Sequence, residues 1–377
     1  MSIVKANTYQ DASGGSNAVF SGVASPPNSM GFRNRIINGD MRIDQRNAGA
    51  SVTVNSGTNT FGVDRWKGQA SGGGVYTQQR STTAPAGFTN SVLLTVTTAD
   101  SSIASTDYYI WGQAIEGFNA ADFGWGTANA QTVTLSFWVR SSVTGTYALF
   151  VGNNGDTRSL VATYTISAAN TWEQKTVTIA GDTSGTWATD NSIGIGLWFT
   201  LGAGSSFNAT ANVWNASLEM NTSGSAQWIA TNGATFYITG VQLEAGTVAS
   251  PFERRDYGRE LIMCQRYLPA FTADATTYRI PGSGICASTT QAYFTVVFPQ
   301  TARVPATGIT VSSGSHFTVD VDGLVAPTST AVAFSTLSSL NGARISVQVA
   351  SGLTLGQPMF LTINNSSGKL LFTGCEL

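Results

Sequence analysis

Residues 132–140 read Thr-Val-Thr-Leu-Ser-Phe-Trp-Val-Arg, and this stretch decides the expected fold. Apolar side chains fill every second position: Val133, Leu135, Phe137 and Val139. Strict alternation of this kind is typical of a strand with one buried face. The pattern continues over residues 146–151, 160–166, 172–179, 193–201 and 236–243. Many such strands, separated by Gly, Asn and Asp turns, favour an all-β jelly-roll sandwich over βαβ units.

Residues 250–268 break this pattern with helical spacing, because Leu261, Met263, Cys264 and Tyr267 can share one stripe. Ser250 is a suitable N-cap, Pro251 suits the first turn, and Glu253 sits at the third helical position. Pro269 closes the segment. We therefore expect a short helical connector over residues 251–269.

The alternating pattern returns after the connector. Seven short strands are expected over residues 293–298, 309–311, 317–321, 331–334, 343–349, 359–363 and 370–374. This number of strands suffices for a small sandwich. The predicted organisation is an N-terminal arm (1–34), a jelly-roll β-sandwich (35–250), the helical connector (251–269) and a second small β-sandwich domain (270–377).

Composition excludes several classes of function. Charged residues make up only 11% of the 377 residues and the net charge is −2, so the basic patch that nucleic-acid binding requires is missing. A single His excludes a His-rich metal site, and the three Cys lie too far apart for a CxxC motif. We expect no cofactor. The longest apolar run, residues 193–201, is too short to span a membrane, and the N-terminus lacks a signal-peptide core.

Catalysis of glycoside cleavage needs two carboxylates that flank one bond. The acidic residues of the jelly-roll region are scattered through turns, at positions 116, 122, 156, 173, 182, 190 and 219. No pair has a spacing that forces convergence. We therefore expect a protein that is not an enzyme, with a polysaccharide-degrading enzyme as an alternative.

Tryptophan and arginine on otherwise small, polar strand faces are the candidate glycan-binding residues. Trp138 and Arg140 share the polar face of residues 132–140, and Trp198 is flanked by Gly196 and Thr200. Trp111 stands near Gln113 and is included in the same set. Aromatic faces can stack on sugar rings, but Trp and Arg are also favoured where a neighbouring subunit covers a surface. Both interpretations stay open, and we expect the Trp138, Arg140 and Trp198 side chains to share one face.

The first 34 residues are rich in Ser, Gly, Asn and Ala and show almost no periodicity. Such a segment cannot bury enough apolar surface to fold alone. It does carry spaced apolar side chains that a partner could accept by strand addition, among them Ile3, Val4, Tyr9, Phe20 and Phe32. We interpret it as an attachment arm.

Several short blocks resemble one family of domains. Arg33–Met41 and Phe61–Trp66 are similar to the opening of jelly-roll domains in tailed-phage and prophage virion proteins. The stretches 241–246, 251–255 and 264–267 resemble the ending of that domain, and 298–305 resembles the start of the C-terminal β domain that often follows, with Ala302 where Met is usual. The resemblance implies a virion appendage protein and a homotrimer.

The opening and ending also resemble jelly-roll carbohydrate-binding modules, whose acidic residues hold a structural calcium ion. Asp40 and Asp64 are the corresponding calcium candidates, but Thr239 and Gly240 stand where further acids would be. Calcium requires six to eight oxygen ligands. The preferred interpretation of both acids is therefore solvated turn residues, with no metal.

Together these observations predict a structural component of a tailed-phage virion, a tail fibre or similar appendage with a host-surface glycan adhesion role. It would be made in the host cytoplasm without a signal peptide, dock on other virion proteins through the arm, and neither bind nucleic acid nor insert into a membrane. The alternative within the virion is a head-attached fibre or decoration protein without a receptor role.

Overall fold

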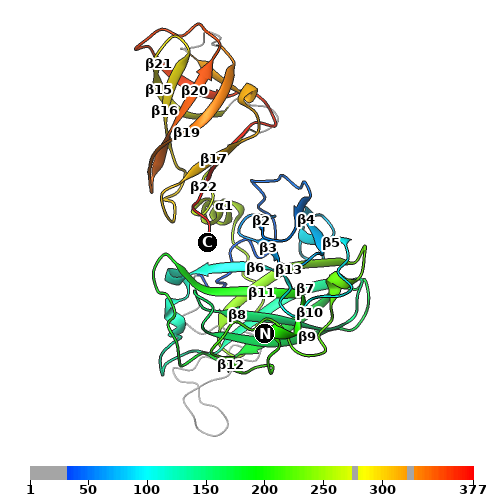
Figure 1. The fold of residues 1–377 in the computed structure, drawn as a ribbon. Coiled ribbons are helices and arrows are strands. Elements are labelled where there is room, and N and C mark those ends of the chain that lie inside the picture. The colour runs from blue at the N-terminus through cyan, green and yellow to red at the C-terminus, as the bar shows by residue number, and fades with distance from the viewer. Residues whose placement is uncertain (1–31, 274–278, 321–326) are drawn as a thin grey trace, which may run out of the picture. The chain divides into compact units, whose positions relative to one another are not determined.

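The computed structural model describes residues 32–273, 279–320 and 327–377 (Figure 1). The chain divides into two compact units, Met1–Arg33 and Asn34–Leu377. Of the predicted arm residues, Ile3, Val4, Tyr9 and Phe20 lie outside the described residues. Phe32 is half-buried and has a left-handed backbone, with φ at 57°.

The first sheet of the larger unit has six antiparallel strands in the order β1-β4-β5-β13-β7-β10. Their bounds are β1 (Val52–Val54), β4 (Val75–Ser81), β5 (Ser91–Thr98), β13 (Thr235–Ala245), β7 (Val133–Ser141) and β10 (Glu173–Ile179). The alternation predicted for β7 is confirmed, since Val133, Leu135, Phe137 and Val139 are fully buried.

The second sheet has seven antiparallel strands in the order β12-β9-β8-β11-β6-β3-β2. They are β12 (Trp214–Asn215), β9 (Ser159–Ile166), β8 (Gly145–Gly152), β11 (Ile193–Ala203), β6 (Tyr108–Glu116), β3 (Lys67–Ala70) and β2 (Asn59–Phe61). The two sheets bury their facing side chains in one shared core. Figure 1 shows β6, β11 and β8 side by side within this sandwich. The all-β jelly-roll prediction is confirmed.

Two stacked indoles occupy this core. Trp66 and Trp111 are fully buried, with ring centroids 4.4 Å apart and an interplanar angle of 2°. Trp111 Nε1 donates to Gln78 Oε1 at 3.0 Å, and Trp66 Nε1 donates to the Asn38 carbonyl at 3.0 Å. Both polar atoms therefore have the partners that buried donors require.

The connector helix is shorter than expected. Helix α1 runs from Tyr257 to Gln265, and Asp256 caps it by accepting a hydrogen bond from the Arg259 backbone at 2.9 Å. The predicted cap at Ser250 is wrong, because its hydroxyl donates to Glu244 instead. Glu253 N similarly donates to Gln242 Oε1 at 2.7 Å, so acceptors on β13 hold residues 250–253 out of helical geometry. Cys264 and Tyr267 are buried, as their stripe predicted.

Two further sheets follow the helix. The smaller has the order β14-β22-β17, with β14 (Ala270–Thr272), β22 (Lys369–Thr373) and β17 (Gly308–Val311). The larger has the order β18-β21-β15-β16-β20-β19, with β18 (Phe317–Asp320), β21 (Pro358–Ile363), β15 (Arg279–Cys286), β16 (Gln291–Val297), β20 (Gly342–Val349) and β19 (Ser329–Ser339). Each of the seven predicted strands has its counterpart. Strand β15 was not predicted, because Pro281, Gly282 and Gly284 interrupt the alternation of apolar and polar side chains.

Short 3-10 turns complete the described structure: η2 (Gly117–Asn119), η3 (Ala121–Phe123), η4 (Ser205–Phe207), η5 (Trp228–Ala230) and η6 (Gly314–His316). Within the described ranges, no helix has the length and apolar character needed to cross a membrane.

Replacing Trp111 with Ala is expected to lower the free energy of unfolding by about 3–5 kcal/mol, because it empties the stacked pair at the centre of the sandwich. Denaturant unfolding followed by far-UV circular dichroism measures the loss. Trp138→Ala is the matched control and should cost clearly less, since Trp138 is only half-buried. Equal losses for the two variants would contradict this description of the core.

Candidate functional site

A hollow of about 420 Å³ lies on the outward face of the seven-stranded sheet. Ile110 of β6, Phe150 of β8 and Trp198 of β11 belong to its lining. These side chains form an apolar cluster separate from the sandwich core, because their strand neighbours point inward while they point outward. Phe207, after β11, and Met220, after β12, complete the apolar part of the lining.

Two glycines let the indole of Trp198 lie low on the sheet. A Cβ atom at Gly196 would stand 2.6 Å from Trp198 Nε1, and one at Gly112 would stand 2.8 Å from Cε3. Trp198 has two cross-strand partners, Gly112 on β6 and Phe150 on β8. The Phe150 ring lies 6.4 Å from the indole at an angle of 21°. Any larger residue at either glycine position would meet the ring.

Lys67 supplies the single cation among the residues that line the hollow. It is only 8% exposed, and Nζ donates to a main-chain oxygen of Leu377, the last residue of the sequence, at 2.8 Å. The ammonium lies 5.4 Å from the Trp198 ring. Burial, together with the nearby charge of Arg65, lowers the pKa of Lys67 to about 8, and the charge of Glu376 opposes this decrease.

The turn between β8 and β9 forms a polar rim. Asn153 is buried and holds the turn together, since its Oδ1 accepts from the backbone of Thr157 at 3.0 Å and of Arg158 at 2.9 Å. Asn154 and Asp156 are exposed and line the hollow. Asp156 is the single carboxylate among the lining residues.

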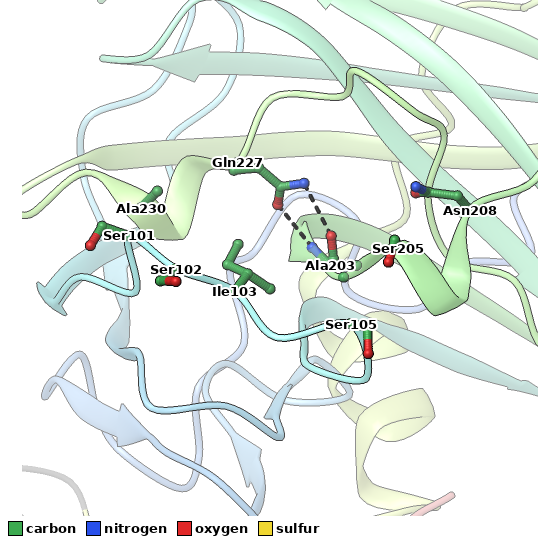
Figure 2. Close-up of a pocket in the computed structure, with 10 residues that line it drawn as sticks. Ser101, Ser102, Ile103, Ser105, Ala203, Ser205, Asn208, Gln227 and Ala230 are labelled. Carbon is green, nitrogen blue, oxygen red and sulfur yellow. Dashed lines mark hydrogen bonds between the residues drawn. The ribbon is translucent and has the colours of Figure 1, made fainter.

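A second cavity of about 480 Å³ lies where β11 ends, and Figure 2 shows its lining. The side-chain amide of Gln227 pairs with the backbone of Ala203, accepting from its nitrogen at 3.0 Å and donating to its oxygen at 3.1 Å. Small serine and alanine side chains dominate the rest of the wall, and its lining includes neither a ring nor a charged group. The hollow around Trp198 is therefore the better candidate for specific recognition.

Trp138 and Arg140 do not belong to the Trp198 hollow. They lie on β7, in the six-stranded sheet, whereas Trp198 lies on β11 in the seven-stranded sheet. Arg140 Nε donates to the Asn170 carbonyl at 2.8 Å, and its guanidinium lies 5.1 Å from the Tyr237 ring. The expectation that these residues share one face with Trp198 is wrong, because the outward faces of two packed sheets point in opposite directions.

Trp111 is also placed differently from the prediction. It is fully buried against Trp66, and its neighbour Gln113 is buried with it, exchanging hydrogen bonds with the Ile37 backbone at 2.9 and 2.8 Å. Both faces of β6 are covered, so buried residues occupy consecutive positions. The alternation that marks a strand with one exposed face is therefore absent from its sequence. Trp111 cannot contact a ligand.

Asp40 and Asp64 are not solvated turn acids, since they are only 5% and 2% exposed. Asp40 pairs with Arg42 at 2.5 Å, and Asp64 accepts from the backbone and side chain of Gln45 at 2.9 and 2.6 Å. Burial raises the pKa of Asp64 to about 6. Asp40 Oδ2 and both carboxylate oxygens of Asp64 already have partners, and the described part of the chain holds no group of three His, Cys, Asp or Glu suited to a metal. The pair does not fit a calcium site.

Sequence reasoning missed Lys67, Phe150, Phe207 and Met220 as lining residues. Strand β8 did carry a signal, because Ala148 and Phe150 alternate with the core residues Tyr147 and Leu149 and make both faces apolar. Such a strand needs cover on its second face. Lys67 gave no signal, because its hydrogen-bond partner Leu377 lies at the other end of the sequence.

No protein-family model matches this chain, and no curated protein matches it by sequence. Solved structures similar in fold include a phage tailspike domain and several carbohydrate-binding modules. The enzymatically active domain of tailspike protein 4 of bacteriophage CBA120 is 14% identical at a TM-score of 0.30, over 56% of this chain and 21% of that one. This chain thus spans about a fifth of the tailspike chain.

Two carbohydrate-binding structures match over nearly their whole length. The family 11 carbohydrate-binding module of a cellulosomal cellulase from Clostridium thermocellum is 11% identical at a TM-score of 0.28, over 54% of this chain and 99% of the module. The N-terminal cellulose-binding domain of a Cellulomonas fimi glucanase is 16% identical at 0.23, over 49% and 90%. At these scores the similarities carry no argument about function.

The Lys67 ammonium is expected to titrate near pH 8, well below the ordinary lysine value of 10.5. Between pH 8 and 10.5 the unfolded chain would hold a proton that the folded chain lacks, so this residue makes the free energy of unfolding rise with pH in that window. The ¹⁵Nζ and ¹³Cε resonances of labelled lysine report the midpoint, with Lys67→Met identifying the signal. A midpoint near 10.5 would show a hydrated ammonium.

Proposed function

We propose that this protein binds glycans and that the hollow around Trp198 is the binding site. The observation that carries the proposal is the indole held low on an open sheet face by Gly112 and Gly196. A sugar ring has one apolar face, which suits stacking on such a platform, and its hydroxyls suit the polar groups of Lys67 and Asn154 around it.

The dimensions of the hollow support a ligand of this kind. Its volume of about 420 Å³ falls within the range typical of small-molecule sites. The lining combines an apolar floor with a few polar groups at the rim. In such sites the apolar surface supplies affinity and the polar groups fix the orientation of the ligand. The floor is itself a packed cluster with Ile110 and Val161, so the platform is held in place before the ligand arrives.

We propose binding without cleavage. Hydrolysis of a glycosidic bond needs two carboxylates on opposite sides of that bond. Asp156 is the single carboxylate of the lining, and other acids of the sandwich are engaged by cations: Asp182 accepts two hydrogen bonds from Arg158 at 2.7 Å each, and Glu116 accepts from Arg266. The alternative is a polysaccharide-degrading activity. A reducing-sugar assay on the bound glycan tests it, because cleavage would release new reducing ends.

We further propose that the protein is a homotrimeric appendage of a tailed-phage virion and adheres to host-surface glycans. The support is the resemblance of the sequence blocks, together with their convergence in space: Asn38 Nδ2 of the first block donates to the Asp64 carbonyl of the second at 3.0 Å, and Asn34 Nδ2 donates to Val241 at 3.0 Å. A head-attached fibre without a receptor role is the alternative.

Replacing Trp198 with Ala is expected to weaken glycan binding by roughly 5- to 150-fold, which corresponds to the 1–3 kcal/mol that stacking of a flat ring on an aromatic side chain is worth. A glycan array identifies the ligand and isothermal titration calorimetry measures the dissociation constant. Trp138→Ala is the control on the opposite sheet and should leave affinity unchanged. The proposal fails if Trp138→Ala abolishes binding while Trp198→Ala does not.

Deleting residues 2–30 is expected to leave a folded, trimeric protein that is missing from purified virions, because an arm that cannot fold alone is suited to strand addition on a partner. Light scattering reports the oligomeric state, and immunoblotting of purified particles reports incorporation. Normal incorporation of the truncated chain would place attachment elsewhere. A monomeric full-length chain at micromolar concentration would contradict the trimer.

A further inference from the structure

We propose that Asp156 selects a neutral sugar unit with two adjacent hydroxyl groups, and that its carboxylate accepts a hydrogen bond from each of them while the ring rests on Trp198. This inference rests on the proposed function and names the ligand class of the same site. Stacking on an indole discriminates little between sugars, whereas hydrogen bonds to particular hydroxyl groups can discriminate strongly.

A row of small residues joins the indole of Trp198 to the turn that carries Asp156. Gly196 on β11 pairs with Ala114 on β6 and with Gly152 on β8. Trp198 Nε1 lies over Gly196, where a Cβ atom would stand 2.6 Å from it. The turn between β8 and β9 begins directly after Gly152. The floor between the pyrrole edge of the indole and this turn therefore consists of backbone and small side chains.

The turn fixes the position of Asp156 before a ligand is bound. Asp156 has a left-handed backbone with φ at 59°, a conformation that Asp and Asn adopt more readily than most residues. The buried Asn153 holds the turn from below, because its Nδ2 donates to Thr157 Oγ1 and to the Thr186 carbonyl at 2.9 Å each. A polar group that is already positioned loses less conformational entropy when it binds a ligand.

The Asp156 carboxylate has hydrogen-bonding capacity that the protein does not use. Within the described ranges of the chain, its oxygens accept no hydrogen bond and take part in no ion pair. Partial burial raises the pKa of this carboxyl, because the charged form loses contact with water. An ionised carboxylate can only accept hydrogen bonds, and it has two oxygens with which to do so. Two adjacent sugar hydroxyls can supply the two donors.

Trp198 adds an unused donor to the same hollow. No acceptor in the described part of the chain takes its Nε1 hydrogen, and an indole nitrogen can only donate. A sugar hydroxyl both donates and accepts, so a neutral sugar can satisfy the indole donor and the Asp156 acceptor together. An acidic sugar would instead bring a second negative charge to Asp156, and like charges at a binding surface are unfavourable.

The wild-type protein tests the inference with ligands that differ by one hydroxyl group. The array carries neutral oligosaccharides of glucose, mannose and galactose beside their monodeoxy analogues, together with uronic- and sialic-acid oligosaccharides. Removing either of two adjacent hydroxyls is expected to weaken binding of a neutral oligosaccharide by roughly tenfold, because each would bond to a charged group. Removing a hydroxyl elsewhere on the ring should weaken binding less.

Asp156→Asn removes the charge, keeps the size of the side chain and suits the left-handed backbone. This variant is expected to bind the parent oligosaccharide roughly tenfold more weakly and to show a smaller difference between the parent and its monodeoxy analogues. Asp122→Asn is the matched control, since Asp122 is exposed, pairs with Arg35 at 2.7 Å and lies outside the lining. It should keep both the affinity and the hydroxyl preference of the wild-type protein.

Equal affinity of the wild-type protein for the parent and for every monodeoxy analogue would overturn the inference and leave glycan binding intact. An Asp156→Asn variant that keeps the full hydroxyl preference, or binding of acidic oligosaccharides alone, would have the same consequence. Failure to bind any glycan on the array would overturn the proposed function and this inference with it.

Discussion

The structure depends on a short buried segment, residues 34–38, whose polar groups find their partners in distant parts of the chain. Asn34 bonds across to β13, donating to Val241 and accepting from the Leu243 backbone at 3.1 Å. Glu260 of α1 accepts from the Asn38 backbone, and Arg255 donates to the Asn34 and Ile36 carbonyls. Buried backbone groups must be paired. This requirement fixes β13, the helix and the opening segment against one another.

The same segment is connected to the candidate site by a series of contacts through the core. The Asn38 carbonyl holds the indole of Trp66, Trp66 stacks on Trp111, and Trp111 belongs to β6, the strand that also carries Gly112. The position of Gly112 decides whether the Trp198 ring can lie low on the sheet. A platform built on a central strand of a packed sandwich is held more rigidly than one on a loop. The geometry of the candidate site is therefore set by the core beneath it.

The sequence predicted the parts of the fold in which one strand face is buried and the other is not. Strand β7 shows this most clearly, and the small residues around Trp198 correctly predicted an outward indole. Alternation of apolar and polar residues did not predict the faces of β6, because both faces are covered and Trp111 lies in the core. It also could not assign Trp138 and Trp198 to different sheets, because strand pairing is not encoded in local alternation. The role of Lys67 depends on Leu377, 310 positions away, and no local pattern reports such a contact.

The outward face of the seven-stranded sheet is the proposed glycan-binding surface. The most direct measurement follows the indole Nε1–H resonances of the protein by NMR while a glycan selected on the array is added, with Trp198→Phe and Trp138→Phe assigning two of the signals. The Trp198 resonance is expected to shift in proportion to occupancy, and the Trp138 resonance is expected to stay in place. A shift of Trp138 with an unmoved Trp198 would contradict this proposal.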